Sequence, residues 1–390
     1  MNFKQPIELY IVWKKEFAEG LEIANGLYKL FCRNVSSPFD ASVGIPVYYR
    51  FEPTENGMPI PIEANEAKRC MIVLLIDNEF LLDERFQDYA DELVKNEQEN
   101  KNVRVFPISF TKHFVKCRPA ITAKNIVRLH DEKLLEILNQ DSKGFLRTSM
   151  LHEAARFLMN LNVLVSEKIA EAPIKLFISH SKHDDTVKYA MDFKAFVDGK
   201  SQLKTFFDVN DLEYGSDFEV ELNKGIGECV LVVFQSDSYS NREWCRIEAI
   251  TAKRNNCPVV VVNALTNGEK RSFPYLGNVP TIRLRDNYRD IIDLALEKVV
   301  YNLYKRELMT EIANLYKLDI DYKTAALPEL FDILKIKKLM QEKRHKFSVV
   351  LYPDPPLGSE EMAILNDMND DLFFITPNQL PTLEKIQNDK

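Results

Sequence analysis

The sequence predicts an α/β protein built from parallel β-sheets that are covered by helices. Between residues 174 and 303, apolar runs typical of strands alternate four times with helical stretches. One of these runs, Val230–Phe234, is apolar throughout, as expected for a strand that is buried on both faces. A similar alternation occupies residues 1–165. Such alternation gives parallel sheets whose strands are joined by right-handed crossovers.

In the middle region, each expected strand is followed by a helix. Ser240, with Glu243 three residues later, forms a capping box, which predicts a helix from there to about Arg254. The expected strands are Lys175–His180, Thr205–Val209, Val230–Phe234 and Pro258–Val262, and the expected helices are Val187–Val197, Phe218–Gly225, Ser240–Arg254 and Tyr288–Val299. In parallel sheets of this kind, ligands bind beyond the carboxyl ends of the strands.

The first 165 residues are predicted to form a second domain of the same architecture. A constant shift of 158 residues sets Leu231 against Val73 and Trp244 against Phe86, and it places Ala90 opposite Glu248. One hypothesis is a degenerate copy of the middle domain that lacks its carboxylate and serves assembly or sensing. The alternative is an unrelated α/β domain with similar alternation. The expected elements are strands Leu9–Trp13, Gly44–Tyr49, Met71–Ile76 and Val103–Ile108, with helices Phe17–Phe31 and Asp83–Val94.

The pattern changes near Leu308, and we expect a small third module there, to which we assign no chemistry. The predicted domains are therefore residues 1–165, 172–305 and 306–390. Within the last, the expected elements are helices Met309–Leu318 and Ala326–Lys337, then the β-α-β piece Phe347–Leu351, a helix from Ser359, and Leu372–Thr376.

Composition narrows the classes of function. The net charge of -8 over 390 residues argues against general nucleic-acid binding, which needs a basic face. There is no apolar run of the roughly 20 residues that a membrane span requires, and no signal peptide is expected at the start. The six cysteines form no C-x-x-C pair, so we expect no metal site. These features predict a cytoplasmic protein.

Four segments of the middle region resemble the TIR (Toll/interleukin-1 receptor) domain family. They match, in order, the family's first strand and the loop after it, its second strand and BB loop, its third strand, and the helix carrying its W-x-x-x-E motif. The segments are Phe177–Ser181, Phe206–Gly215, Val230–Ser236 and Ser240–Glu248. Together they cover about a third of the chain, and their combination is more specific than any one of them.

The resemblance implies a flavodoxin-like parallel sheet and one of two activities. Some TIR domains only self-associate as adaptors, whereas others cleave the nicotinamide–ribose bond of NAD. In the cleaving members, the glutamate that matches Glu248 is catalytic. Residues matching Ser181, Lys182 and Glu213 lie along the nucleotide site in those members. Relatives vary at the first two positions, and Lys182 retains one positive charge.

The residues themselves also suggest a sugar-plus-base site. Trp244 and Glu248 are four apart, so they share one face of the predicted helix. A carboxylate can stabilise the oxocarbenium-like state of glycosidic cleavage, and nicotinamide leaves without a second acid to protonate it. Asp208 is either a ligand contact or a turn cap, and His180 is either a ligand contact or a polar strand end.

The sequence thus predicts an NAD+ nucleosidase that hydrolyses or cyclises its substrate at the nicotinamide bond, with Glu248 as the catalytic carboxylate. NAD+ is the substrate, and no cofactor is expected. Self-association through TIR surfaces, and a regulatory partner protein or nucleotide signal, are expected to activate the enzyme in antiphage defence or signalling. The alternatives are a non-catalytic TIR scaffold and a nucleotide sensor that binds without cleavage.

Overall fold

The chain divides into two compact units, Lys4–Pro173 and Ile174–Lys390, each described by itself below. The computed structural model describes residues 3–34, 43–55, 57–138, 141–159, 164–165, 168–169, 174–182, 186–199, 207–211, 229–268, 273–285, 287–316, 322–323, 330–343, 348–368 and 372–382. No helix within these ranges is long and apolar enough to cross a membrane.

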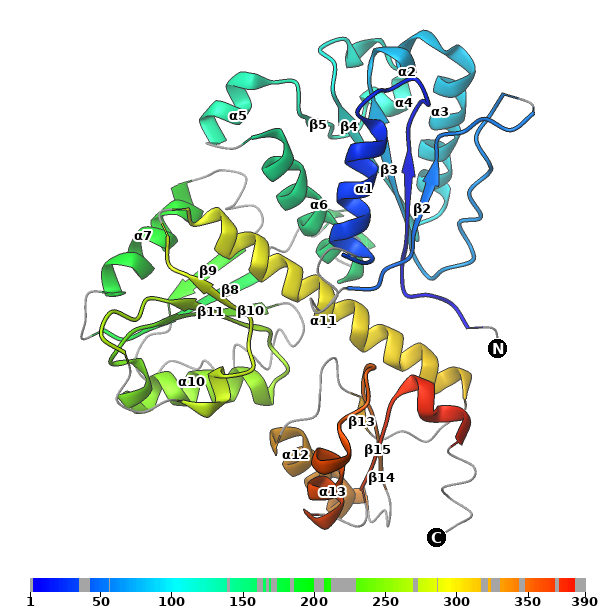
Figure 1. The fold of residues 1–390 in the computed structure, drawn as a ribbon. Coiled ribbons are helices and arrows are strands. Elements are labelled where there is room, and N and C mark those ends of the chain that lie inside the picture. Colours follow the sequence, from blue (N-terminus) through cyan, green and yellow to red (C-terminus); the bar gives the residue numbers. More distant parts are fainter. Residues whose placement is uncertain are drawn as a thin grey trace. The chain divides into compact units, whose positions relative to one another are not determined.

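The first unit contains a five-stranded parallel sheet in the order β2-β1-β3-β4-β5 (Figure 1). Its central strand is buried along its whole length, as predicted for a strand with helices on both faces. The strands are β1 (Glu8–Val12), β2 (Val47–Arg50), β3 (Cys70–Ile76), β4 (Val103–Ser109) and β5 (Val127–Arg128). The helices are α1 (Gly20–Phe31), α2 (Asn78–Leu82), α3 (Glu84–Glu99), α4 (Pro119–Thr122), α5 (Glu132–Leu138) and α6 (Ser142–Leu158), with the 3-10 turn η1 (Phe114–Lys116). A short antiparallel pair, β6 (Leu164–Val165) and β7 (Lys168–Ile169), follows.

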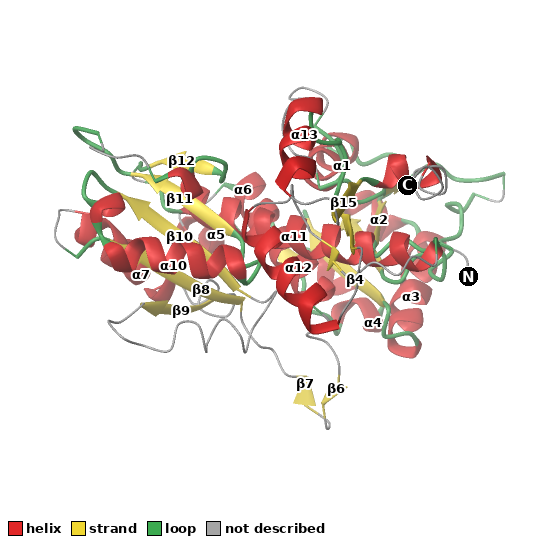
Figure 2. Ribbon diagram, turned by 90° about the horizontal axis from the view of Figure 1, so that it is seen from below, coloured by secondary structure: helices red, strands yellow, loops and turns green. Residues whose placement is uncertain are grey.

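The second unit repeats this topology in a sheet of order β12-β11-β10-β8-β9, whose strands lie side by side in Figure 2. All its pairings are parallel, as the alternation predicted. The strands are β8 (Ile174–His180), β9 (Phe207–Asp211), β10 (Cys229–Gln235), β11 (Val259–Asn263) and β12 (Thr281–Arg283), with helices α7 (Thr186–Gly199), α10 (Glu243–Arg254) and α11 (Arg289–Leu315) and the turns η2 (Tyr239–Asn241) and η3 (Pro274–Leu276).

Side-chain alternation along β10 divides the core of this sheet into two layers. Leu231 and Val233 pack with α10 on one face. On the other face, the ring of Phe234 lies 5.7 Å from the ring of Phe193 in α7. Figure 1 shows α10 and α11 on opposite sides of the sheet. The carboxyl ends of the strands are thereby left as one rim, where ligands bind in folds of this class.

Several predicted boundaries are corrected by the structure. The helix expected from Ser240 begins at Glu243, with Arg242 as its N-cap and no side-chain cap. Ser240 lies instead in η2, where the Arg242 N–H bonds to the Tyr239 carbonyl. The helix expected at Phe17 begins at Gly20, because Lys14–Gly20 forms turns. The helix expected at Phe218–Gly225 lies outside the described residues.

The boundary predicted at residue 306 falls inside a continuous helix. The sequence predicted separate helices ending at Val299 and beginning at Met309, but α11 has no glycine or proline to interrupt it. Its first half buries Ile292 and Leu296 near the sheet, and its second half buries Met309 against Leu351 of the C-terminal module. The predicted β-α-β piece forms there as β14 (Ser348–Leu351), α13 (Ser359–Met368) and β15 (Leu372–Ile375), joined by β13 (Tyr322–Lys323), α12 (Leu330–Lys343) and η4 (Pro377–Thr382).

The central strands of the two sheets, and the helices after them, correspond with a shift of 159 residues, not the predicted 158. Cys70 and Cys229 begin the two central strands. On the helices, the buried Phe86 and Ala90 take the places of Cys245 and Ala249. The predicted pairing is therefore one residue out. The predicted pairing set the exposed Trp244 against the buried Phe86, whereas the corrected pairing sets two buried residues against each other.

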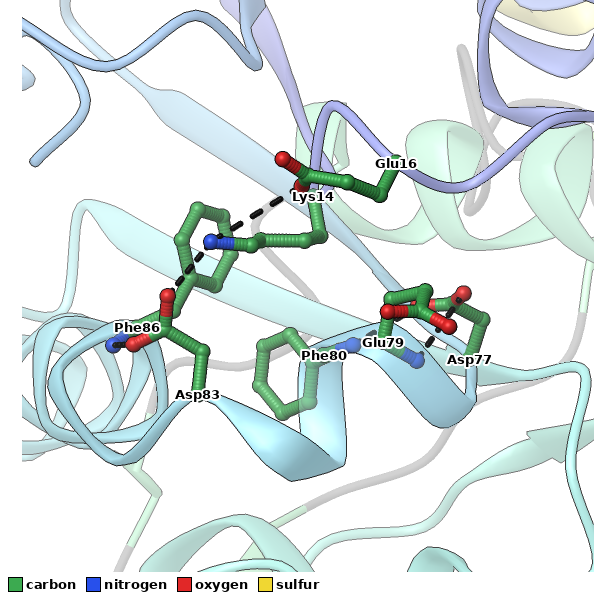
Figure 3. A network of polar contacts seen from close by, with 7 residues as sticks. All are labelled: Lys14, Glu16, Asp77, Glu79, Phe80, Asp83 and Phe86. Atoms are coloured by element: carbon green, nitrogen blue, oxygen red, sulfur yellow. Dashed lines mark hydrogen bonds and ion pairs between the residues drawn. The ribbon is translucent and has the colours of Figure 1, made fainter. Parts of the chain in front are cut away.

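The carboxyl-end rim of the first unit carries an ion-paired network (Figure 3). Lys14, just after β1, binds the Asp83 carboxylate, which lowers the pKa of Asp83, and it lies 5.7 Å from the centre of the Phe86 ring. Asp83 also accepts the Phe86 N–H at 3.1 Å as the N-cap of α3. Asp77 caps α2 through the Phe80 N–H at 2.9 Å. These carboxylates are engaged in holding helix ends.

Helix α1 supplies a test of packing in the first unit. A Cβ at Gly20 would lie 2.3 Å from Cδ1 of the fully buried Trp13, whereas a Cβ at Gly26 would meet nothing within 4 Å. We expect Gly20→Ala to lower the free energy of unfolding by about 1–3 kcal/mol through overpacking. Gly26→Ala should raise it by about 0.5–1 kcal/mol through helix propensity. Urea unfolding of both variants measures this; equal effects would contradict the packing at Trp13.

Candidate functional site

The candidate site lies at the rim where β8 and β10 end and α10 begins. Because strands in a parallel sheet end at the same edge, the loop after β8 and the first turns of α10 converge there. Ser179 stands next to the last residue of β8 and pairs in register with Val233 of β10. Its side chain shares the face of Phe177, which packs in the cluster beneath α10.

Glu248 is held by a chain of buried hydroxyl groups. The Ser179 hydroxyl donates to Oε2 of Glu248 at 2.5 Å. The same hydroxyl lies 2.7 Å from the hydroxyl of Tyr239, which is fully buried. The Tyr239 hydroxyl in turn donates to the Cys245 carbonyl of α10 at 3.1 Å. These contacts tie the strand, the turn η2 and the helix together around one carboxylate.

Burial raises the pKa of Glu248 to about 7. The hydrogen bond from Ser179 and the charge of Lys182 both act in the opposite direction, but they do not offset the desolvation. Desolvation penalises the charged form of a carboxyl group, and functional sites often contain such shifts. Near pH 7, this carboxyl group is therefore divided between its acid and its carboxylate.

The neighbours of Glu248 differ in what they can offer a ligand. Trp244, one turn earlier on α10, is 51% exposed, so its indole is a half-open apolar surface at the rim. Lys182 is exposed and close enough to lower the pKa of Glu248. Ser181 is 1% exposed, and its hydroxyl lies 2.7 Å from that of Ser238, so it joins two loops of the rim.

A second cluster of contacts holds the loops after β10 and β11 together. Both carboxylate oxygens of Asp237 accept hydrogen bonds, from the backbone N–H groups of Thr266, Asn267 and Gly268 and from the Thr266 hydroxyl, at 2.8–3.1 Å. The bond from Asn267 contributes most to lowering the pKa of Asp237 to about 2. Gly268 adopts a positive φ of 89°, which glycine tolerates without strain.

The remaining predicted site residues are placed differently. His180 follows Ser179, so strand alternation directs its side chain to the opposite face of the sheet, away from α10. Its carbonyl accepts the Cys245 thiol at 3.7 Å. Asp208 lies on β9, but its side chain is outside the described residues, as is all of Glu213. The structure therefore brings Trp244 and Lys182 to the rim around Glu248.

Two residues that sequence reasoning missed, Ser179 and Tyr239, are the ones that touch or support Glu248. A serine within an otherwise apolar strand is a detectable signal, since a buried hydroxyl needs a hydrogen-bond partner. Tyr239 carries no such signal, because a tyrosine before a helix is usually a core residue. Only the fold shows that its hydroxyl reaches a residue 60 positions away.

At the equivalent place, the first unit has the same scaffold with different chemistry. The shift of 159 sets Phe80 against Tyr239 and Tyr89 against Glu248. The strand registers set Val12, which pairs with Leu74, against Ser179, which pairs with Val233. Phe80 and Val12 are fully buried, and burial raises the pKa of Tyr89 to about 12. The hydroxyl chain and its carboxylate are thus both missing there.

The comparisons with known proteins bear on the second unit. Residues 176–299 match the family model described as TIR domain. Residues 176–299 form a TIR domain. No curated protein matches the chain. Within the TIR domain, Glu248 stands on α10 with Trp244 four residues before it.

Matches to solved structures over the whole chain are poor. A protein described as a phosphosugar isomerase from Clostridium difficile 630 is 10% identical, with a TM-score of 0.19; the match covers 85% of this chain and 89% of that one. Tagatose-6-phosphate ketose/aldose isomerase from Escherichia coli is 12% identical, also at 0.19, over 76% and 82% of the two chains. Such low scores support no argument about this protein.

The buried carboxyl group makes a testable contribution to stability. Glu248 ionises near pH 4.5 when unfolded but near pH 7 in the TIR domain, so its stabilising effect is complete below about pH 4.5 and is lost as the pH rises through 7. Glu248→Gln mimics the acid form. We expect it to raise the free energy of unfolding by about 1–2 kcal/mol at pH 8, after allowance for partial exposure, and to change it little at pH 4.5.

Thermal unfolding of the full chain at both pH values measures this difference. Glu243→Gln, at an exposed carboxylate in the first turn of the same helix, is the matched control and should give no gain at pH 8. A variant at Glu248 that is equally stable relative to wild type at both pH values would mean that the carboxyl group is not desolvated.

Proposed function

We propose that the TIR domain is an NAD+ nucleosidase that breaks the bond between nicotinamide and ribose. One observation carries the proposal: Glu248 is a partly desolvated carboxylate fixed by the Ser179 hydroxyl at the ligand-binding rim of the sheet. A structural glutamate on a helix is ordinarily solvated or ion-paired, and this one is hydrogen-bonded to a buried serine instead. TIR domains include enzymes that cleave NAD, which makes this substrate the first to test.

In this proposal, Glu248 acts in its ionised form. Cleavage of an N-glycosidic bond develops positive charge on the ribose, and a carboxylate held in place stabilises that charge without reorganising. The nicotinamide ring already carries a positive charge and leaves as a neutral molecule, so no general acid is required. Trp244 offers an aromatic surface for the nucleotide, and Lys182 offers a positive charge for its phosphates.

The products and the control of the enzyme belong to the proposal as well. Hydrolysis would release ADP-ribose, and attack by a group of the substrate itself would give a cyclic product. Self-association through TIR surfaces would activate the domain, as TIR domains commonly self-associate. The first unit and the C-terminal module would then receive a partner protein or nucleotide signal in the cytoplasm, in a defence or signalling setting.

A non-catalytic scaffold is the second candidate, and one observation favours it. Trp244 and Ile247 are 51% and 41% exposed on neighbouring positions of α10, where they form an apolar surface of the kind used for protein contacts. A scaffold would use this surface without turnover. A related alternative is a sensor that binds a nucleotide at the same rim, as the enzyme would, but does not cleave it.

The deciding measurement is nicotinamide release from NAD+ by the purified full chain, dilute and at high concentration. We expect release from wild type and at least a 100-fold loss in Glu248→Gln, the magnitude typical for removing one electrostatic contact to a transition state. Glu243→Gln, on the exposed side of α10, is the control for a lost charge. No release from wild type under any of these conditions would favour the scaffold or sensor.

The pH dependence of the cleavage tests the state of the carboxylate. Because ionised Glu248 is the active form, kcat/KM should rise with pH and level off above about 7. Lys182 lowers the pKa of Glu248, so Lys182→Met should move this rise to higher pH, by up to about one unit. Rates measured between pH 5 and 9 show the shift. A rise that stays in place in Lys182→Met would remove the lysine from the electrostatics of the site.

A further inference from the structure

The three contacts around Glu248 cannot all be hydrogen bonds while Glu248 is ionised. The carbonyl of Cys245 can only accept, so the Tyr239 hydroxyl must donate to it at 3.1 Å. The Ser179 and Tyr239 hydroxyls, 2.7 Å apart, need one proton between them, and the 2.5 Å contact from Ser179 to Glu248 needs another. Three contacts require three protons, whereas two hydroxyls carry only two.

The protonated acid supplies the missing proton. Glu248 then donates to Ser179, Ser179 donates to Tyr239, and Tyr239 donates to the Cys245 carbonyl. In the ionised state, Ser179 turns to donate to the carboxylate, because a hydrogen bond to a charged group is about twice as strong as a neutral one. The Tyr239 hydroxyl can then donate its one proton either to Ser179 or to the Cys245 carbonyl, but not to both. The Cys245 carbonyl also lies within α10, whose regular pattern gives it the Ala249 N–H as a second partner.

We propose that Ser179 and Tyr239 are positioning residues that form a hydroxyl relay, in which the hydrogen bonds reverse direction as Glu248 gains or loses its proton. The relay keeps the carboxyl group in one orientation in both states. The relay sets what fraction of Glu248 is ionised, and its role in catalysis therefore rests on the proposed function. The relay itself is a property of the folded protein and can be measured without any activity.

The two residues of the relay favour opposite states of Glu248. Ser179 favours the ionised state, because its hydroxyl is the donor to the carboxylate. Tyr239 favours the protonated state, because only then are all three contacts satisfied. Loss of the serine hydroxyl should therefore raise the pKa of Glu248, and loss of the tyrosine hydroxyl should lower it. A residue that merely fills space has no reason to produce opposite signs.

The other groups around Glu248 do not reproduce this pattern. Among the described residues, Lys182, after β8, is the charged side chain that alters the pKa of Glu248. Variants that lose the serine or the tyrosine hydroxyl both retain this lysine. The Cys245 thiol on α10 donates to the His180 carbonyl. The other titratable groups on described elements packed against α10 are Lys175 and His180 on β8, Cys229 on β10, Cys257 before β11, Tyr275 on η3, and Asp332, Lys335, Lys337, Lys338 and Glu342 on α12.

The experiment is a pH titration of the Glu248 carboxyl carbon by NMR. The full chain is labelled with ¹³C at the glutamate carboxyl groups, and the Glu248 signal is identified by its absence in Glu248→Gln. We expect Ser179→Ala to raise the pKa by about one unit and Tyr239→Phe to lower it by about one unit, the size expected when one hydrogen bond to an ionisable group is lost. Ser179→Cys, with a weak donor of similar size, should fall between wild type and Ser179→Ala.

Tyr304→Phe is the matched control, because Tyr304 is a fully buried tyrosine on α11 and is not one of the groups that affect the pKa of Glu248. It should leave the Glu248 titration unchanged. Opposite shifts in the two relay variants support the relay; shifts of the same sign, or none, overturn it. If circular dichroism shows that either variant fails to fold, the sign of the Glu248 pKa shift in the other variant, together with the shift in Ser179→Cys, still tests the relay.

The same variants separate the relay from the proposed activity. If wild type cleaves NAD+, the rise of kcat/KM with pH should move up in Ser179→Ala and down in Tyr239→Phe, in step with the titration. Opposite titration shifts without any cleavage by wild type would uphold the relay and reject the proposed function. Cleavage whose pH profile is the same in all three proteins would reject the relay and retain the function.

Discussion

The burial of β10 on both faces is the constraint on which the second unit depends. A strand without a solvent face must be covered by helices on each side, and it must pair with parallel neighbours whose crossovers those helices provide. That arrangement forces the ends of β8, β10 and β11 to one rim. Residues far apart in the sequence, such as Ser179 and Glu248, then meet because their elements leave the sheet at the same edge.

Around Glu248 the domain gives up stability for a poised carboxyl group. A carboxylate in this place loses hydration, and the hydrogen bond from Ser179 together with the charge of Lys182 does not replace it. Sites that perform chemistry often hold such groups, whereas a purely structural design would use an apolar residue or a complete ion pair. Asp237 shows the contrast within the same rim: several donors surround it, its pKa falls, and its role is to join loops.

The first unit shows what the same topology does without this group. Its sheet has the same strand order, and its α3 buries the same helix face, yet the positions equivalent to the hydroxyl chain hold Val12, Phe80 and Tyr89. Its rim is instead organised by the pairing of Lys14 with Asp83, where the carboxylate also caps a helix.

The amino-acid order by itself determined the fold class and the alternation of strands and helices through the central strands of both units, and it offered Glu248 and Trp244 as candidates, because hydrophobic periodicity and short motifs are local properties. It did not predict the last strand of either sheet, β5 and β12, which are short. It placed the start of α10 three residues early and split α11 in two, since helix ends depend on contacts that local propensity does not contain. Only the tertiary structure decided the shift of 159 residues between the units, the facing of His180 away from α10, and the partnership of Ser179 and Tyr239 with Glu248. Those outcomes depend on strand register and on burial. Both arise only when distant segments pack together, so the sequence of a single segment does not determine them.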